Sequence, residues 1–195
     1  EWGRRYSPRP DVAVRIIEHF HTHPGYIRAL VEKINLGLDR FPPGEDVFLL
    51  FSAHGIPVKV VENGDPYARH TEETVRAVMQ AGGWPHPHLL CYQSKVGSGR
   101  WVQPTLLGSI RELGGSGVRS LLVVPVSFVT DHVETLNEID IEAREKAGRA
   151  GIRRFEMMPA LNDSPTFIGA LADLVLRAVG KEKPTPSHQG HEDHQ

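Results

Sequence analysis

The clearest fold signal in this sequence is the run SLLVVPV at residues 120–126. A short, uninterrupted apolar run of this kind is typical of a strand buried on both faces, as in a parallel sheet. Residues 47–51 (VFLLF) have the same character, and shorter candidates lie at residues 88–92 and 153–158. The sequence therefore predicts a small sheet of about four strands, and residues 120–126 give the strongest strand signal.

Segments with helical periodicity separate these strands. Residues 24–38 carry apolar side chains at the spacing of one helical face, namely Ile27, Leu30, Val31, Ile34 and Leu38. Further helices are expected over residues 71–80, 104–113, 131–150 and 165–179, and Gly-Gly pairs follow the first two of these. Strands that alternate with helices favour the α/β class with parallel pairing. We expect a three-layer, Rossmann-like or flavodoxin-like unit.

The composition argues against several classes of protein. The 195 residues suit a single domain, and 22 Lys and Arg against 24 Asp and Glu leave a net charge of −2. This balance offers no basic footprint for nucleic acid. One cysteine can form neither an internal disulfide nor a [2Fe–2S] site of cysteine ligands. Because we see neither a signal peptide nor an apolar run of membrane-spanning length, we expect a cytoplasmic protein.

The two ends of the chain differ from its middle. Residues 1–22 begin with Glu1 and open on the aperiodic stretch EWGRRYSPRP, so we interpret them as a lead-in from the end of an upstream domain. Residues 23–180 carry the alternating pattern and form the predicted domain. Residues 181–195 are polar and interrupted by proline, which predicts a disordered tail. We expect the tail histidines to be solvated or to bind metal only incidentally: His188, His191 and His194.

Polar side chains follow three of the expected strands. His54 comes after the first strand and Lys95 after the second, while Asp131, His132 and Glu134 come after the third. Because the carboxyl ends of parallel strands meet at one edge of a sheet, where ligands collect, we expect these side chains to lie close together. An imidazole can take a proton near neutral pH or bind a divalent metal ion. The alternative for His54 is a turn histidine that only caps backbone groups.

An acidic row extends this cluster. Glu134, Glu138 and Glu142 recur every four residues, so on an α-helix they share one face, with Asp131 one turn before them. Carboxylates combined with imidazole suit Fe(II), Zn(II), Mn(II) or Mg(II). A solvated helix face is the alternative interpretation of Glu142, and a helix N-cap is the alternative for Asp131.

Several segments together resemble the ferrochelatase family. The segment FSAHGIP at residues 51–57 is similar to the segment that carries that family's active-site histidine, and GDPY follows at residues 64–67. YQSKVG at residues 92–97, with Trp101 and Pro104 downstream, resembles a second family motif. PVSFVTDHVETL at residues 125–136 resembles the signature around the active-site glutamate, and NDSP at residues 162–165 matches near the C-terminal end. The resemblance runs in order over residues 23–179.

This resemblance implies the insertion of ferrous iron into a porphyrin dicarboxylate, which gives haem and releases two protons. It implies that His54 and Glu134 are the catalytic and metal-handling pair. It also implies a proton or metal path through four further side chains: Asp131, His132, Glu138 and Glu142. The implied porphyrin pocket is shaped by Tyr92, Gln93, Ser94, Lys95 and Trp101. The implied partners are the porphyrin and ferrous iron, with a peripheral membrane contact for porphyrin access and no cofactor beyond the substrate metal.

Members of this family consist of two similar α/β halves with a cleft between them, and the segments above match the C-terminal half. We therefore expect the missing N-terminal half, or a partner chain, to complete the cleft. Two alternatives stay open at this point. One is a cobalt or nickel chelatase for another tetrapyrrole, against which the QSKVG motif and Trp101 argue. The other is a non-catalytic half-domain that binds metal or tetrapyrrole.

Overall fold

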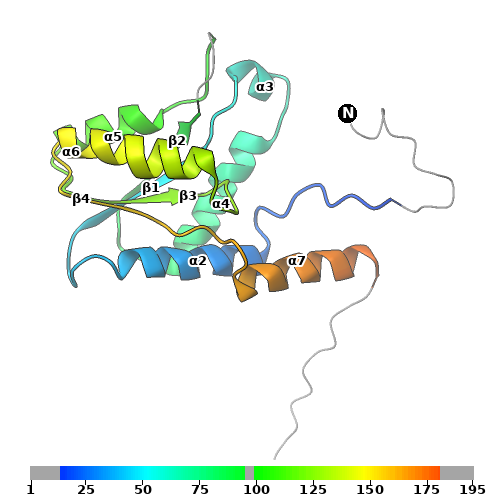
Figure 1. The fold of residues 1–195 in the computed structure, drawn as a ribbon. Coiled ribbons are helices and arrows are strands. Elements are labelled where there is room, and N and C mark those ends of the chain that lie inside the picture. The colour runs from blue at the N-terminus through cyan, green and yellow to red at the C-terminus, as the bar shows by residue number, and fades with distance from the viewer. Residues whose placement is uncertain (1–13, 95–98, 181–195) are drawn as a thin grey trace, which may run out of the picture.

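The computed structural model describes residues 14–94 and 99–180, and its centre is a parallel sheet of four strands (Figure 1). The strand order is β2-β1-β3-β4, and every neighbouring pair is parallel. The predicted α/β class and the predicted number of strands are therefore confirmed, and the order is that of the first four strands of a flavodoxin-like sheet. The strands are β1 (Val47–His54), β2 (His88–Gln93), β3 (Ser120–Pro125) and β4 (Arg154–Met157).

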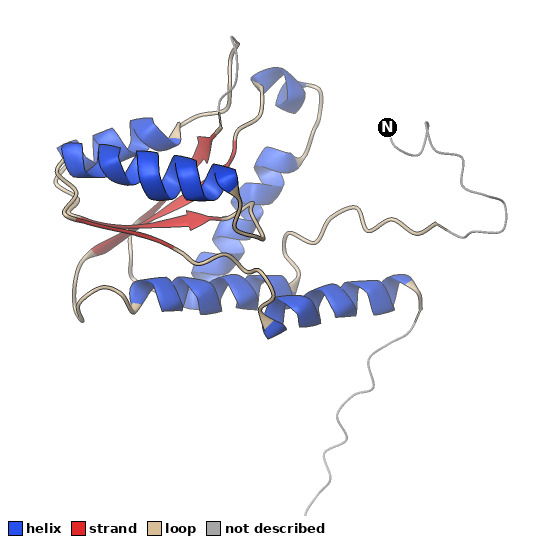
Figure 2. Ribbon diagram, in the orientation of Figure 1, coloured by secondary structure: helices blue, strands red, loops and turns tan. Residues whose placement is uncertain are grey.

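Helices cover both faces of the sheet and make three layers (Figure 2). One face carries α2 (Pro24–Leu38), α4 (Tyr67–Gly82) and α7 (Pro165–Ala178). The other carries α5 (Leu106–Gly115), the π-helix η1 (Glu134–Ala143) and α6 (Arg144–Arg149). The short helix α3 (Val58–Glu62) follows β1 and was not among the expected helices.

The strands are buried on both faces because their side chains alternate between two cores. Phe51 of β1 and Val124 of β3 pack toward α2, α4 and α7, where Ile34 is also fully buried. Leu50 and Val123 point to the opposite face and pack with α5, η1 and α6. Every residue of β3 is buried, which explains why its sequence is an unbroken apolar run.

Helix boundaries follow local capping. Nδ1 of His23 accepts a hydrogen bond from the backbone N–H of Gly25, next to Pro24 in the first turn of α2. Ser164 Oγ likewise accepts from the backbone N–H of Phe167 at the start of α7. Gly83 ends α4 in the left-handed conformation, with φ of 63°. The expected starts of α2 and α7 are confirmed, whereas α4 spans residues 67–82 rather than 71–80 and α5 spans residues 106–115 rather than 104–113.

The largest difference from the sequence prediction lies after β3. We expected an α-helix from Asp131 to Ala150, but residues 134–143 form a π-helix and only residues 144–149 are α-helical. The backbone N–H of Arg144 accordingly donates to the carbonyl of Ile139, five residues back. The buried side chains of η1 are Thr135, Ile139 and Ala143, spaced by four. That spacing fits an α-helix and a π-helix about equally over ten residues, so the sequence pattern did not distinguish them.

The described part of the lead-in lies against the domain. The side chain of Phe20 packs on the core beside α2, and its ring meets that of Tyr26 edge to face at 5.3 Å. Contacts with the folded unit therefore begin before residue 23. The N-terminal stretch of residues 1–13 and the predicted tail of residues 181–195 lie outside the described residues.

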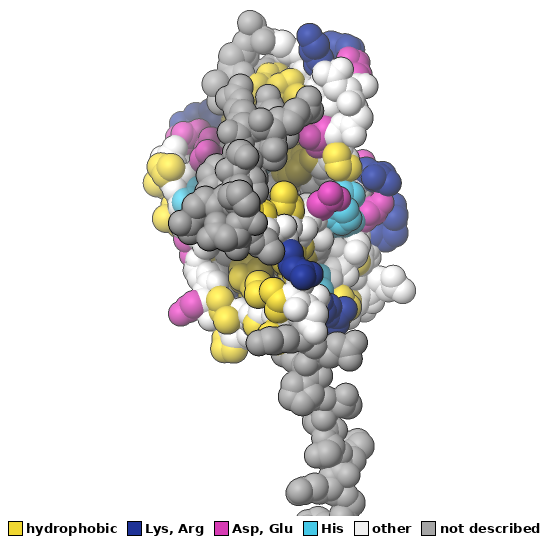
Figure 3. Space-filling view, turned by 90° about the vertical axis from the view of Figure 1, so that its right-hand side faces the viewer, with side chains coloured by type: hydrophobic (Ala, Val, Ile, Leu, Met, Phe, Trp, Pro, Cys, Tyr) yellow, Lys and Arg dark blue, Asp and Glu magenta, His cyan; other side chains and the backbone are white. Residues whose placement is uncertain are grey.

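The surface carries charges of both signs. On the face seen in Figure 3, Lys and Arg side chains lie interspersed with Asp and Glu, and hydrophobic side chains are exposed between them. This mixture agrees with the nearly balanced charge of the chain. Within the described ranges, no helix combines the length and the apolar character needed to cross a bilayer.

Candidate active site

The imidazole of His54 and the carboxylate of Glu134 face each other at the carboxyl edge of the sheet. His54 Nδ1 lies 3.4 Å from Glu134 Oε2, and each side chain is 43% exposed. His54 is the last residue of β1, rather than a turn residue after it as we expected, and Glu134 is the first residue of η1. Strand order places β1 and β3 side by side, at the point where the connections change direction and where such sheets bind ligands. The predicted pair is thus brought together.

Two backbone contacts hold the end of β1. The backbone N–H of His54 donates to Ser127 Oγ at 2.9 Å, which links it to the residues after β3. The N–H of Gly55 donates to the carbonyl of Gln93 at 2.8 Å, at the end of β2. A Cβ atom on Gly55 would lie only 2.6 Å from that carbonyl oxygen, so a glycine is needed next to the histidine.

His132 positions the glutamate through the backbone. Its Nδ1 accepts a hydrogen bond from the N–H of Glu134 at 3.2 Å. Thr135 Oγ1 donates to the carbonyl of His132 and accepts from its N–H, at 3.0 and 3.1 Å. These bonds satisfy backbone groups at the start of η1, as a helix cap does. The ring of Phe128 lies between the two histidines, 6.1 Å from that of His54 and 5.0 Å from that of His132.

Gln93 connects the strands to the π-helix. Its side chain is almost fully buried, and its Oε1 accepts a hydrogen bond from Ser52 Oγ at 2.6 Å. Its Nε2 donates to the backbone carbonyl of Glu134 and to Glu138 Oε2, both at 3.5 Å. Ser94 Oγ donates to the same Glu138 oxygen at 2.8 Å. The amide therefore fixes η1 against the ends of β1 and β2.

A cavity of about 420 Å³ adjoins this network. Five of the predicted site residues line it: Tyr92, Gln93, Ser94, Glu138 and Glu142. Asn137 also lines it, and its Nδ2 donates to Glu142 Oε1 at 2.9 Å, so this glutamate is held by its neighbour five positions earlier. Desolvation raises the pKa of the Tyr92 phenol to about 12, which keeps this wall of the cavity neutral. The lining of the cavity thus combines the phenol of Tyr92 with the carboxylates of Glu138 and Glu142 from the acidic row.

Two further predicted residues, Asp131 and Trp101, contact other segments of the fold. Asp131 exchanges two hydrogen bonds with Asn162: its N–H donates to Oδ1 at 3.0 Å, and its Oδ2 accepts from Nδ2 at 2.8 Å. Trp101 forms a β-bridge with Pro57, three residues after His54. Lys95 lies outside the described residues.

Apolar side chains surround the polar edge. Val133 is 75% exposed next to Glu134, and Leu136 and Leu107 are also exposed. Leu107 borders the cavity described above. Exposed apolar side chains beside polar groups are typical of a surface that binds a ligand with apolar and polar parts.

Sequence reasoning missed Ser127, Ser52 and Asn137. Hydroxyl and amide side chains are common in turns and on helices, so their residue types give little warning. Their positions in the sequence could have identified two of these residues. Ser127 comes directly after the apolar run of residues 120–126, and Ser52 lies two residues before His54 on β1, so the two side chains share a face.

The chain is similar in sequence to known proteins. The sequence model of the ferrochelatase family matches residues 1–179. The ferrochelatase of Gloeobacter violaceus is 51% identical over 181 residues, which are 92% of this chain and 55% of that protein. The ferrochelatase of a Nostoc species is 48% identical and that of a Geobacter species 47%; each alignment covers 85% of this chain, and 43% and 52% of those proteins.

The chain therefore spans about half the length of the curated relatives that it matches. Among solved structures, a putative cobalamin biosynthesis protein of Marinobacter aquaeolei is 16% identical with a TM-score of 0.47, covering 69% of this chain and 98% of that one. This likeness is too distant to bear on function. The family match and the identities of about one half establish that the chain belongs to the ferrochelatase family.

Proposed function

We propose that this chain supplies the metal-inserting side of an enzyme that places Fe(II) in a porphyrin dicarboxylate to give haem. The observation that carries the proposal is the His54–Glu134 pair, 3.4 Å apart at the carboxyl edge of a parallel sheet. Membership of the ferrochelatase family supports it, since relatives named for this activity are about half identical over most of the chain.

The reaction requires a base at the porphyrin nitrogens. Two pyrrole N–H bonds break as two metal–nitrogen bonds form, and two further porphyrin nitrogens donate lone pairs. Fe²⁺ enters and two protons leave, so charge balances and no electron is transferred. His54 turns Nδ1 toward Glu134, which leaves Nε2 for the porphyrin, and the carboxylate stabilises the imidazolium that forms. The pair therefore removes protons without requiring any other cofactor.

The acidic row then takes the protons away. Gln93 holds the backbone of Glu134 and the carboxylate of Glu138 on the same side of η1. Glu138 and Glu142 line the adjoining cavity, which is large enough for ordered water between them. No hydrogen bond joins the three carboxylates directly in the described part of the chain, so we assign the connection to water.

The porphyrin rests on the apolar rim. Val133 and Leu136 flank the pair and are exposed, so a macrocycle covering them buries apolar area. A second half, in the same protein or in a partner chain, closes the other side of this open site. We include in the proposal that no [2Fe–2S] cluster is held by these residues, because the single cysteine, Cys91, is buried in β2 and burial raises the pKa of its thiol to about 12. Iron–sulfur absorption bands would contradict this part.

Substitution of the pair tests the proposal in the complete enzyme. We expect His54→Ala to abolish iron insertion and Glu134→Gln to lower the turnover number at least about 100-fold, since each removes a proton-transfer group. Loss of porphyrin fluorescence on metallation measures turnover. His86→Ala and Glu112→Gln are matched controls, because neither residue lines the site, and both should retain activity. Turnover at the unsubstituted level in His54→Ala would overturn the assignment.

A second assay separates the alternative chelatases. Metallation is compared for Fe(II), Co(II) and Zn(II) with a porphyrin dicarboxylate and with a more carboxylated tetrapyrrole. Preference for Fe(II) and the dicarboxylate supports the proposal. Binding of porphyrin without insertion of any metal would instead support a non-catalytic half-domain.

A further inference from the structure

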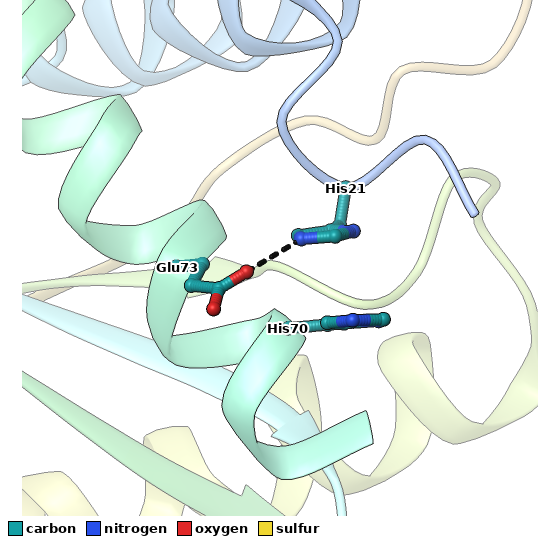
Figure 4. Close-up of side chains that lie close together, drawn as sticks. All are labelled: His21, His70 and Glu73. Carbon is teal, nitrogen blue, oxygen red and sulfur yellow. Dashed lines mark hydrogen bonds and ion pairs between the residues drawn. The ribbon is translucent and has the colours of Figure 1, made fainter. Parts of the chain in front are cut away.

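A second group of metal-ligating side chains lies where the lead-in crosses α4 (Figure 4). His21 comes from the segment before α2, while His70 and Glu73 lie one turn apart on α4. His21 Nε2 is 2.7 Å from Glu73 Oε2. The rings of His21 and His70 are stacked, with centroids 3.8 Å apart and planes 9° from parallel. One ligand atom from each of the three side chains lies within 4.8 Å of the others.

A hydrogen bond fixes the backbone of His21, but one of its two ring nitrogens has no hydrogen-bond partner among the described residues. Thr74 Oγ1 donates to its backbone carbonyl at 2.9 Å, which ties the segment to α4. Its Nδ1 is buried and has no hydrogen-bond partner among the described residues. An ion shared with Glu73 would bind to Nε2, the ring nitrogen that faces this carboxylate, and the ring proton would then reside on Nδ1.

The local electrostatics favour the ligating forms. Desolvation lowers the pKa of His70, and the nearby His21 and His19 add to this effect. The hydrogen bond from His21 lowers the pKa of Glu73. The ring of His19 lies 4.9 Å from that of His70 and places a third imidazole beside the group. An imidazole binds a metal ion in its neutral form, and a carboxylate binds it in its ionised form.

We propose that His21, His70 and Glu73 form a binding site for a divalent transition-metal ion, separate from the His54–Glu134 pair. Two imidazoles and a carboxylate suit Zn(II), Co(II), Ni(II) or Fe(II) rather than Mg(II) or Ca(II). With metal–ligand bonds of about 2.0–2.1 Å, tetrahedral ligand atoms lie about 3.4 Å apart. The three side chains are partly buried, and binding of one ion requires the two stacked rings to turn out of their parallel arrangement so that a nitrogen of each faces the metal.

An ion bound at this site would also link two segments of the chain. A cavity of about 270 Å³ beside it is lined by His21 and His70 at one end and reaches Ser127, the residue that holds the backbone of His54. His21 belongs to the lead-in, and its two partners belong to the domain. A bound ion would therefore fasten the lead-in to α4 next to the end of β3, in addition to the Thr74 hydrogen bond.

Zinc titration of the full chain tests this inference. The background is a variant with His54, His188, His191 and His194 all changed to Ala, so that neither the pair nor the tail contributes imidazole. Calorimetry with ZnCl2 should show one tight site, and Co(II) should give the visible bands of a low-coordinate site. In this background His70→Ala, and separately Glu73→Gln, should weaken Zn(II) binding at least about tenfold.

Matched controls use neighbouring groups outside the cluster. Glu72→Gln changes the next, exposed carboxylate of α4, and His86→Ala removes an imidazole elsewhere; both should bind Zn(II) like the background. Far-UV circular dichroism checks that His70→Ala keeps its helices. Unchanged zinc affinity in both His70→Ala and Glu73→Gln would overturn the proposal. The stacked histidine rings and the contact between His21 and Glu73 would then have a structural role only. Because His54 is already absent, the result is independent of the proposed iron insertion.

Discussion

At the scale of single residues, the position of His54 and Glu134 is set by other side chains. Both partners are half-exposed, and an exposed ion pair contributes only about 0–1 kcal/mol to stability. Their separation follows instead from backbone bonds to Ser127 and His132, and from the buried amide of Gln93. The geometry of the pair is thus set by its surroundings.

Gln93→Leu tests this dependence. The substitution keeps most of the volume but leaves the buried Ser52 hydroxyl without its acceptor and Glu138 without one donor. We expect the free energy of unfolding to fall by about 1–3 kcal/mol, measured by urea denaturation of the chain. Metallation by the complete enzyme should fall as well, because η1 loses its anchor. The exposed Gln103→Leu is the control, and equal stability of the two variants would contradict the role given to Gln93.

At the scale of elements, the sequence predicted most of the fold. A continuous apolar run such as residues 120–126 is typical of a buried strand. Pro24 marks a helix start because it lacks a backbone N–H, and Ser164 because its hydroxyl caps the first turn. The π-helix escaped prediction because Glu134, Glu138 and Glu142 keep a common face in either helix type. Gln93 contacts the π-helix at the backbone carbonyl of Glu134 and at the Glu138 carboxylate.

The same reasoning applies to the site. The convergence of strand ends in a parallel sheet predicted that His54 and Glu134 would lie close together with other polar side chains, and the resemblance to ferrochelatases singled them out as the pair. The roles of His132 and Asp131 were not predictable, since each depends on a partner brought in by the fold. His132 caps the start of η1, and Asp131 bonds to Asn162 from beyond β4.

Gly55→Ala probes the junction of β1 and β2. The added methyl would lie 2.6 Å from the carbonyl oxygen of Gln93, so the strand end must shift. We expect a loss of about 1–3 kcal/mol in the free energy of unfolding, and a larger fractional loss of metallation because His54 moves with it. Gly169→Ala in α7 is the matched control: nothing lies within 4 Å of its added methyl, so helix propensity should stabilise it by up to about 1 kcal/mol. Wild-type behaviour of Gly55→Ala would refute the close contact.

At the scale of the whole molecule, the candidate active site is exposed to solvent at the carboxyl edge of the sheet. The cavity, the acidic row and the exposed side chains of Leu107, Val133 and Leu136 belong to the same side of the sheet, and the chain covers about half the length of its relatives. A large flat substrate placed there would touch this chain on one face only. The other face then contacts the second half proposed above.

Val133→Ser tests the apolar rim in the complete enzyme. The side chain is 75% exposed, so its replacement should change the free energy of unfolding by less than about 0.5 kcal/mol. Porphyrin binding, followed by fluorescence quenching, should weaken severalfold because less apolar area is covered. Ile168→Ser on α7, a similarly exposed residue on the opposite face of the sheet, should leave binding unchanged. Equal porphyrin affinity in the two variants would count against this placement of the substrate.

The two hydrogen bonds between Asp131 and Asn162 have a kinetic consequence. They join the loop before η1 to the turn that starts α7, segments more than thirty residues apart in the chain. When the C-terminal helix detaches in a local opening event, that turn releases Asp131, and the start of η1 loses a restraint. We therefore expect amide hydrogen exchange at Asp131 to rise in any local opening event that separates the start of α7 from the loop before η1.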